Sequence, residues 1–147
     1  MYLVFDTETT GLPRSWNAPK SDLANWPRIV QIAWATFDEQ QRPMATRSFL
    51  VRPDGFTIPD EATRVHGIST ARASKEGVAL SEALAAFSQA LVATKVVVAH
   101  NLEYDETVVG AEFARAQLAE PFGKRRRICT MKESTDLCAI PAAKGFK

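Results

Sequence analysis

The stretch VFDTETTGL, residues 4–12, starts as an apolar strand and then turns polar. Its first residues complete the apolar run of residues 2–6, and turn-forming glycine and proline follow soon after, as is typical of a central strand. Side chains alternate across a strand, so Asp6 and Glu8 project to one side and Thr7 to the other. The stretch therefore predicts two neighbouring carboxylates at the end of a core strand.

The composition is that of an ordinary globular protein, with 46% hydrophobic and 24% charged residues. A length of 147 residues favours a single domain, residues 1–147, with a hydrophobic core of its own. The formal net charge of +1 creates no chain-wide field for a polyanion, so a nucleic-acid surface must be local.

The cysteines and histidines exclude one kind of site. Cys129 and Cys138 are the only cysteines, they lack C-x-x-C spacing, and the chain has two histidines, so we expect no zinc site. Both cysteines are interpreted as buried small hydrophobic residues. We find no signal peptide and no apolar run long enough to span a bilayer, and we expect a cytoplasmic protein without membrane contact.

Two further strands are expected after a long loop. The loop, residues 13–27, is rich in Pro, Asn, Ser, Asp and Trp. The segments RIVQIAWATF (28–37) and ATRSFLV (45–51) have the composition of strands. A polar turn separates them, which favours an antiparallel pair.

Two helical segments come next. IPDEATRVHGI (58–68) predicts a short helix, with Asp60 as a possible cap and Gly67 at its end. Residues 78–94 predict an amphipathic helix, because apolar residues recur four, three and four positions apart. That stripe consists of Leu80, Leu84, Phe87 and Leu91.

The rest of the chain alternates strands and helices. We expect a buried strand at 96–99, a helix at 102–118 with Val108, Ala111 and Leu118 on one side, a strand at 127–130 and a helix at 131–139. This order predicts an α/β domain with a mixed sheet covered by helices. Residues that follow parallel strands meet at one edge of such a sheet. The carboxylates after residues 2–6 and the polar residues after 96–99 therefore come together if these two strands are neighbours.

The second polar segment, VVVAHNLEYD (96–105), runs from a buried strand into a helix. It places Asp105 one turn inside the helix, where a carboxylate is favoured by the helix dipole and also faces the strand ends. By itself the segment is equally compatible with an ordinary helix start, in which His100 and Asn101 are turn or capping residues.

Two carboxylates this close repel each other unless a cation lies between them. Oxygen ligands at a water-accessible edge suit Mg²⁺ or Mn²⁺. A solvated acidic turn is the alternative, and D-x-E spacing by itself favours it. Glycoside hydrolysis is a poor interpretation, because its carboxyl groups must lie about 5–9.5 Å apart.

Three segments together resemble the DEDD 3′–5′ exonucleases, the DnaQ-like family. They are FDTETTGL (5–12), IPDEATRVHGIS (58–69) and VVVAHNLEYD (96–105), in this order. The sequence is most similar to the proofreading type, the epsilon subunit of DNA polymerase III. The resemblance implies a ribonuclease H-like fold, in which a five-stranded mixed sheet is flanked by helices. It also implies two divalent ions, Mg²⁺ or Mn²⁺.

The resemblance assigns roles to individual residues. Asp6, Glu8 and Asp105 match the catalytic metal ligands of the first two motifs. Positions that lie near the substrate strand in this family are matched by Thr9, Gly11, Leu12, His66, Asn101 and Tyr104. Residue type alone also allows a structural interpretation for three of these: Leu12 as loop packing, His66 as a helix-end residue on a carbonyl group, and Tyr104 as core.

The family's third motif, His-x-x-x-x-Asp, is missing after Asp105. His100 and Asp105 have this spacing themselves, but they directly follow a buried strand, as the second motif requires. We therefore expect that the domain is C-terminally incomplete and lacks its C-terminal helix. Loss of that helix would expose apolar surface on the sheet.

The sequence thus predicts a metal-dependent 3′–5′ exonuclease that acts on DNA or RNA. A single-stranded DNA end is the expected partner, and a DNA polymerase is a candidate partner. The alternative, motivated by the missing third motif, is a catalytically inactive nucleic-acid or polymerase-binding module on the same fold.

Three other features have both a structural and a functional interpretation. The basic run KRRR (124–127) fits a solvated loop better than a phosphate contact. Trp16 and Trp26 flank the long loop, where a tryptophan packs against the sheet or stacks on a base. Trp34 lies in the middle of a strand and is assigned to the core.

Overall fold

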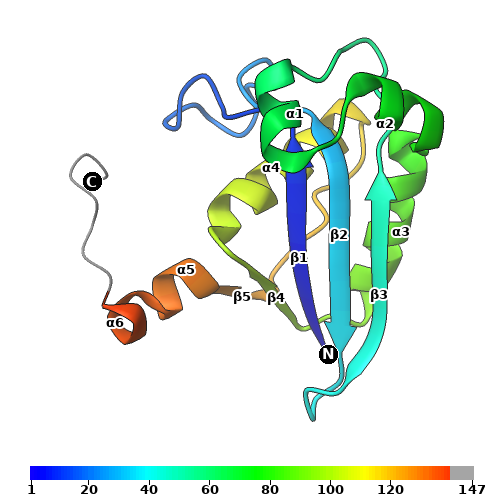
Figure 1. Ribbon diagram of the computed structural model, residues 1–147. Coiled ribbons are helices and arrows are strands. Elements are labelled where there is room, and N and C mark those ends of the chain that lie inside the picture. Colours follow the sequence, from blue (N-terminus) through cyan, green and yellow to red (C-terminus); the bar gives the residue numbers. More distant parts are fainter. Residues whose placement is uncertain (140–147) are drawn as a thin grey trace.

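The computed structural model describes residues 1–139; the end of the predicted domain, residues 140–147, lies outside the described residues. A five-stranded sheet with the order β3-β2-β1-β4-β5 forms its centre (Figure 1). The strands are β1 (Tyr2–Thr9), β2 (Ile29–Phe37), β3 (Pro43–Leu50), β4 (Val96–Ala99) and β5 (Arg126–Cys129). The sequence prediction of a five-stranded sheet is confirmed.

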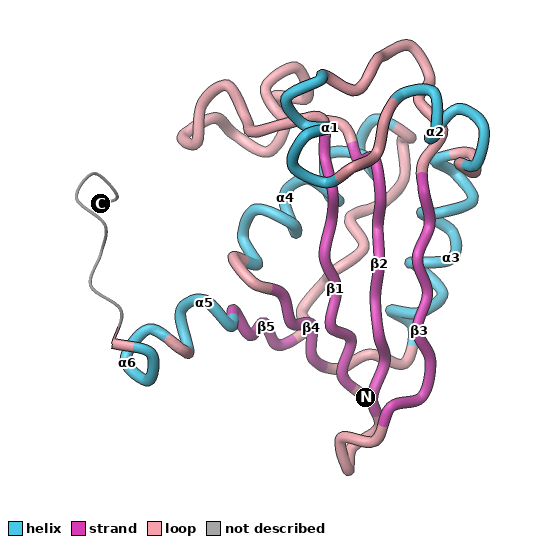
Figure 2. The backbone as a smooth tube through the Cα atoms, viewed as in Figure 1, coloured by secondary structure: helices cyan, strands magenta, loops and turns pink. Residues whose placement is uncertain are grey.

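The sheet is mixed, with an antiparallel half and a parallel half. β1, β2 and β3 pair antiparallel, whereas β1, β4 and β5 pair parallel. Figure 2 shows these strands side by side. β4 thus lies directly beside β1, although about 90 residues separate them in sequence. The expected neighbourhood of the first strand and residues 96–99 is confirmed.

Helices cover both faces of the sheet. α3 (Leu80–Val92) and α4 (Leu102–Arg115) pack on one face, and α1 (Asp60–His66) and α2 (Thr70–Glu76) lie on the other, near one end of the strands (Figure 1). Two short helices, α5 (Thr130–Glu133) and α6 (Thr135–Cys138), follow β5. No helix among the described residues combines the length and the apolar character needed to cross a membrane.

The main core lies between the sheet and helices α3 and α4. β1 contributes Leu3 and Phe5, which alternate with outward-facing residues as a half-buried strand requires. The rings of Phe5, Phe87 and Phe122 pack against one another, with centroids 5.4–5.9 Å apart. Trp34 is 5% exposed, as predicted for a core residue.

The helix expected at 58–68 is shorter than predicted, since α1 covers Asp60–His66, and a second helix follows it. Asp60 is the first residue of α1 and not its cap; Pro59 holds the cap position, and no side chain caps this helix. Gly67 ends α1 in the left-handed conformation (φ 74°), as predicted. The sequence analysis missed α2, which starts at a Ser69 cap that accepts a hydrogen bond from the Arg72 amide.

Some predicted burial is wrong. Leu118 lies beyond the end of α4 and is 49% exposed, because the helix ends at Arg115 and not at residue 118. Cys138 is exposed and Cys129 is half-buried, so only the latter packs against the core. The helix expected at 131–139 is two short helices that contain no buried residue.

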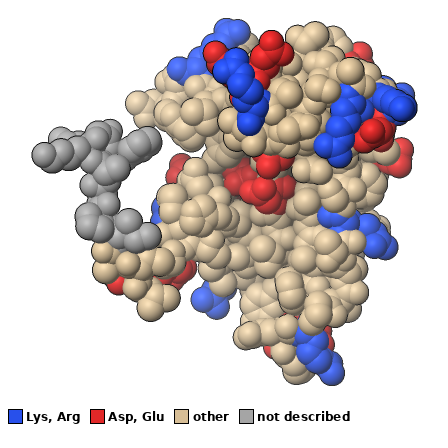
Figure 3. All heavy atoms as spheres, in the orientation of Figure 1, with Lys and Arg blue, Asp and Glu red and all other residues tan. Residues whose placement is uncertain are grey.

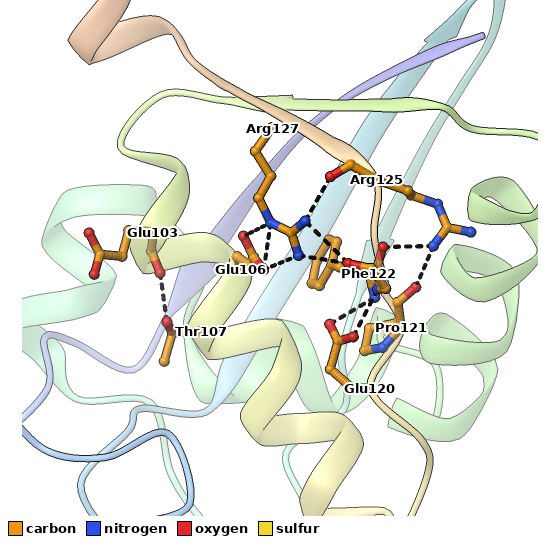
Figure 4. A network of polar contacts seen from close by, with 9 residues as sticks. Glu103, Glu106, Thr107, Glu120, Pro121, Phe122, Arg125 and Arg127 are labelled. Atoms are coloured by element: carbon orange, nitrogen blue, oxygen red, sulfur yellow. Dashed lines mark hydrogen bonds and ion pairs between the residues drawn. The ribbon is translucent and has the colours of Figure 1, made fainter.

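The basic run at 124–127 is solvated only in part, because Lys124 and Arg126 are exposed whereas the Arg125 and Arg127 side chains bind neighbouring elements. The Arg125 guanidinium donates to backbone carbonyl groups of the preceding turn and of α3. Arg127 lies in β5 and forms a two-pronged ion pair with Glu106 of α4, the shortest N–O distance being 2.7 Å (Figure 4). These two arginines therefore fasten β5 and the turn before it to the neighbouring helices.

A buried ion pair fixes α4 to the start of β2. Glu112 is fully buried, and its Oε1 atom accepts from Arg28 Nε at 2.8 Å and from the Ile29 amide at 3.0 Å. Arg115 Nη1 lies 3.1 Å from the same oxygen. A buried carboxylate needs such partners, because desolvation of an unpaired charge is strongly unfavourable.

We predict that Glu112→Ala lowers the free energy of unfolding by about 3 kcal/mol or more, because two arginines and an amide lose their shared acceptor. Glu112→Gln retains an oxygen for the Ile29 amide, so a smaller loss of about 1–3 kcal/mol is expected. Urea denaturation followed by circular dichroism measures both. Equal stability of the alanine variant and the wild type would contradict this account.

Candidate active site

Asp6 and Glu8 lie on the face of β1 opposite the main core. Asp6 is exposed and Glu8 is half-buried, whereas Thr7 and Thr9 between and beside them are buried, as the strand alternation predicts. On the face seen in Figure 3, Asp and Glu side chains gather in a hollow near the middle, and Lys and Arg side chains lie around its rim. An acidic, water-accessible hollow at the end of a core strand results.

Asp105 reaches β1 from the side. The pairing of β1 with β4 ends at Val4 and Val98, so the next residues of β1 have a free edge there. α4 begins just beyond β4, and its Asp105 Oδ1 accepts hydrogen bonds from the Thr7 amide at 3.0 Å and from Thr7 Oγ1 at 2.7 Å. The carboxylate thus satisfies a strand amide that lacks a strand partner.

The electrostatics of Asp105 are unfavourable in the ionised state. Burial, with Asp105 only 3% exposed, raises the pKa of its carboxyl group to about 6. The hydrogen bonds from Thr7 oppose the rise, and the nearby negative charge of Asp6 adds to it. Asp6 and Asp105 are therefore close enough to repel each other.

Within residues 1–139, no basic side chain forms an ion pair with Asp6, Glu8 or Asp105. In the same part of the chain, no three His, Cys, Asp or Glu side chains are grouped closely enough to form a ready metal site. The donor set nevertheless fits a hard divalent cation, because it consists of carboxylate oxygens that repel one another and have no counter-charge.

Thr9, Gly11 and Tyr104 form one hydrogen-bonded group beside the acids. Thr9 Oγ1 and Tyr104 Oη lie 2.7 Å apart, and they reach the Gly11 carbonyl oxygen at 2.7 Å and 2.8 Å. Burial raises the pKa of the Tyr104 hydroxyl, and the negative charges of Asp105 and Glu8 add to the rise. Gly11 has a φ of 142°, which favours glycine. The group fixes the path of the chain directly after the first motif.

Leu12 and Asn101 do not have the alternative structural roles, loop packing for Leu12 and helix capping for Asn101. Leu12 is 72% exposed, so it does not pack the loop. Asn101 holds the cap position of α4 in the left-handed conformation (φ 59°, ψ 47°), yet its side chain makes no capping hydrogen bond. Both side chains are free to contact a ligand.

His66 differs from its expected structural role. Its Nδ1 atom accepts a hydrogen bond from the Ile68 amide at 3.1 Å instead of donating to a carbonyl group. The proton of the neutral ring is then on Nε2, which is buried and has no partner within residues 1–139. An unpaired buried donor of this kind is unfavourable unless a ligand or water completes it.

The sequence analysis missed Thr7, although this residue positions Asp105. The alternation of side chains assigned Thr7 to the opposite face, which is correct, and no sequence signal indicated that its amide edge is free. Only the point at which the β1–β4 pairing ends places Asp105 against Thr7.

Asp105→Asn should stabilise the metal-free protein at neutral pH. Above pH 6 the carboxylate is ionised in both the folded and the unfolded chain, and its raised pKa of about 6, compared with 3.8, makes the ionised form unfavourable in the fold. The asparagine oxygen can still accept from Thr7. We expect a gain of about 1–3 kcal/mol at pH 7.5 that shrinks as the pH falls from 6 to 4, because the wild-type carboxyl group takes up its proton in the fold first.

Urea denaturation of both proteins in EDTA, at pH 7.5 and at pH 4, measures this difference in stability. A variant that is less stable than the wild type at pH 7.5 would show that the buried charge does not destabilise the fold.

Solved structures of exonuclease I share this fold. The E. coli enzyme in complex with a dT13 oligonucleotide has a TM-score of 0.77 at 19% identity, over 99% of this chain and 31% of that chain. A product-bound exonuclease I (TM-score 0.76, 19% identity, 99% and 33% coverage) and an ExoI/SSB-Ct complex (0.76, 18%, 99% and 31%) are also similar. This chain spans about a third of the length of those proteins.

The match in sequence is to a family and not to an individual protein. No curated protein sequence matches the chain. The family model described as exonuclease, RNase_T, matches residues 3–139, which include both acidic motifs and all five strands. The chain therefore belongs to the exonuclease family of DEDD-type, DnaQ-like nucleases.

Proposed function

We propose that this exonuclease domain hydrolyses phosphodiester bonds from the 3′ end of single-stranded DNA in a reaction that depends on Mg²⁺ or Mn²⁺. The observation that carries the proposal is the position of Asp105, which is buried without a counter-charge beside Asp6 and fixed to Thr7. A protein retains such a charge where a bound cation offsets the repulsion.

Asp6, Glu8 and Asp105 are the proposed metal ligands. When bound, divalent ions supply charge neutralisation at the phosphate and an activated water. The role of the chain is to hold the three carboxylates in place, and no lysine or arginine among residues 1–139 pairs with them. Thr7 positions Asp105 by occupying one carboxylate oxygen, which leaves the other oxygen for the ion.

The neighbouring residues suit the end of a nucleic-acid strand. Thr9, Gly11 and Tyr104 form a fixed wall, and Leu12 offers an exposed apolar side chain next to it. His66, whose buried Nε2 atom has no partner within residues 1–139, is a further proposed contact to a phosphate or a sugar hydroxyl. The binding of oligonucleotides by exonuclease I, a protein of the same fold, supports a single-stranded DNA substrate.

The expected rate of hydrolysis depends on which group accepts the proton of the attacking water. No His-x-x-x-x-Asp follows Asp105 in these 147 residues, and neither His66 nor His100 takes its place in the sequence. Removal of the water proton by solvent, without a positioned base, lowers the rate by about 10²–10⁴-fold. This observation favours a second candidate function, a nucleic-acid or polymerase-binding module without turnover.

The decisive experiment uses the 147-residue chain and an oligodeoxynucleotide labelled at its 5′ end. We expect slow, stepwise shortening from the 3′ end in Mn²⁺ or Mg²⁺, none in EDTA, and none with Asp6→Asn, because the amide removes an anionic ligand. Glu82→Gln, an acid-to-amide change at an exposed position of α3, is the matched control and should retain full activity.

Three results would contradict the proposal in different ways. Binding of the oligonucleotide without any product in either ion would favour the inactive module. Shortening that persists in Asp6→Asn would exclude this site, and a label released first from the 5′ end would exclude the proposed direction.

Thr7→Val tests the positioning role of Thr7. Valine keeps the shape and the backbone amide but loses the hydroxyl that donates to Asp105 at 2.7 Å. We expect Mn²⁺ affinity, measured by isothermal titration calorimetry, to fall by about 10–100-fold, as is usual when the partner of a metal ligand is removed. Thr107→Val, on the same helix as Asp105 but bonded only to the Glu103 carbonyl group, is the control and should bind Mn²⁺ normally.

A further inference from the structure

A cavity of about 260 Å³ lies between the loop at 13–27 and the first turns of α4. Trp16, Lys20 and Trp26 line it from the loop, and Asn101, Glu103 and Tyr104 line it from the helix. Tyr104 connects the cavity to the group formed with Thr9 and Gly11. The cavity therefore adjoins the candidate active site but extends away from the three acids.

The two loop tryptophans have different environments. Trp26 is 7% exposed, and its Nε1 atom donates to the Pro19 carbonyl oxygen at 3.1 Å, so it is part of the loop's own packing. Trp16 is 58% exposed, and its ring centroid lies 5.8 Å from that of Tyr104 with the planes tilted by 50°. Of the two tryptophans, only Trp16 presents a largely exposed aromatic surface at the cavity.

The loop that carries Trp16 is rigidly fixed. The buried Asn25 side chain accepts from the Ser15 amide at 2.7 Å and donates to the Ser15 carbonyl oxygen at 3.0 Å. At the other end of the loop, Arg115 Nη2 of α4 donates to the carbonyl oxygens of Leu23 and Trp26, both at 2.6 Å. The position of Trp16 is thus set before any ligand binds, which reduces the entropy lost on binding.

The helix side of the cavity supplies a polar side chain, that of Asn101, which makes no hydrogen bond to the start of α4 although Asn101 occupies the cap position. Asn101 is in the left-handed conformation, which asparagine adopts more readily than most residues other than glycine. An amide carries both a donor and an acceptor, as the edge of a nucleobase does.

The charges around the cavity favour a base over a phosphate. Lys20 and Glu103 contribute one positive and one negative charge to its lining. The densest basic run, residues 124–127, does not line the cavity, and two of its arginines, Arg125 and Arg127, are already bound as Figure 4 shows. A nearly neutral cavity with an exposed aromatic ring suits an aromatic, uncharged ligand.

We propose that this cavity binds one nucleobase of the substrate strand, stacked on Trp16 and hydrogen-bonded to the Asn101 side-chain amide. The base belongs to a nucleotide next to the one at the reacting 3′ end, because Tyr104 separates the cavity from the acids. The inference rests on the proposed function and adds to it a subsite that holds the strand through a base.

Fluorescence anisotropy of a labelled oligothymidylate in EDTA tests the subsite without cleavage. Trp16→Ala should weaken binding by about 5- to 150-fold, the range for loss of one base–aromatic stack. Trp16→Phe keeps a ring and should retain most of the affinity. Leu118→Ala, which removes an exposed apolar side chain beyond the end of α4, is the control and should bind as the wild type does.

Abasic oligonucleotides distinguish stacking from a general structural effect. One nucleotide at a time is replaced by an abasic residue. Replacement at a single position near the 3′ end should remove the difference in affinity between the wild type and Trp16→Ala. Tryptophan fluorescence gives a second readout, because Trp26 and Trp34 are buried. Quenching by oligothymidylate should occur in the wild type and be lost in Trp16→Phe.

The outcomes separate this inference from the proposed function. Wild-type shortening of DNA together with unchanged affinity of Trp16→Ala would overturn the base subsite alone. An affinity loss that is equal for every abasic position would also overturn it. Position-specific loss of affinity without metal-dependent shortening would support the subsite and contradict the exonuclease proposal, and no oligonucleotide binding by the wild type would contradict both.

Discussion

The contact between the free edge of β1 and the Asp105 carboxylate determines how this site is built. β4 pairs with β1 only as far as Val4, so the Thr7 amide has no strand partner. Because α4 starts where β4 ends, its first turn lies against this edge, and Asp105 accepts from both Thr7 donors. One interaction thereby ends the sheet locally, docks the helix and brings a third acid to the strand that carries Asp6 and Glu8.

Two buried acids on the same helix illustrate the difference between structure and function. Glu112 shares its oxygen with Arg28, Arg115 and a backbone amide, so its charge is compensated and stabilises the fold. Asp105 accepts from Thr7, has no ion-pair partner within residues 1–139 and has a second acid nearby, and burial raises its pKa to about 6. Natural proteins retain such local conflicts mainly at functional sites, where a ligand resolves them.

The loop at 13–27 shows how contacts distant in sequence convert an irregular segment into a fixed surface. Its hydrogen bonds run from Asn25 to Ser15 and from Arg115 to the loop's carbonyl groups. They bury Trp26 and leave Trp16 beside Tyr104. Both tryptophans lie in the same irregular loop, which has no periodic pattern, so neither role could be assigned from the sequence, and the cavity between loop and helix could not be predicted.

The sequence by itself determined the order of the strands along the chain, the amphipathic helix at α3, the paired acids and the family, because apolar periodicity and short motifs are local properties. It failed at the second helix after Gly67, at the burial of Leu118 and Cys138, and at Thr7. The tertiary structure decided that β4 stops at Ala99 while β1 continues to Thr9, which acid is buried, and which tryptophan remains exposed. These features depend on which atoms of distant segments compete for the same space and the same hydrogen bonds, and no local pattern records that competition.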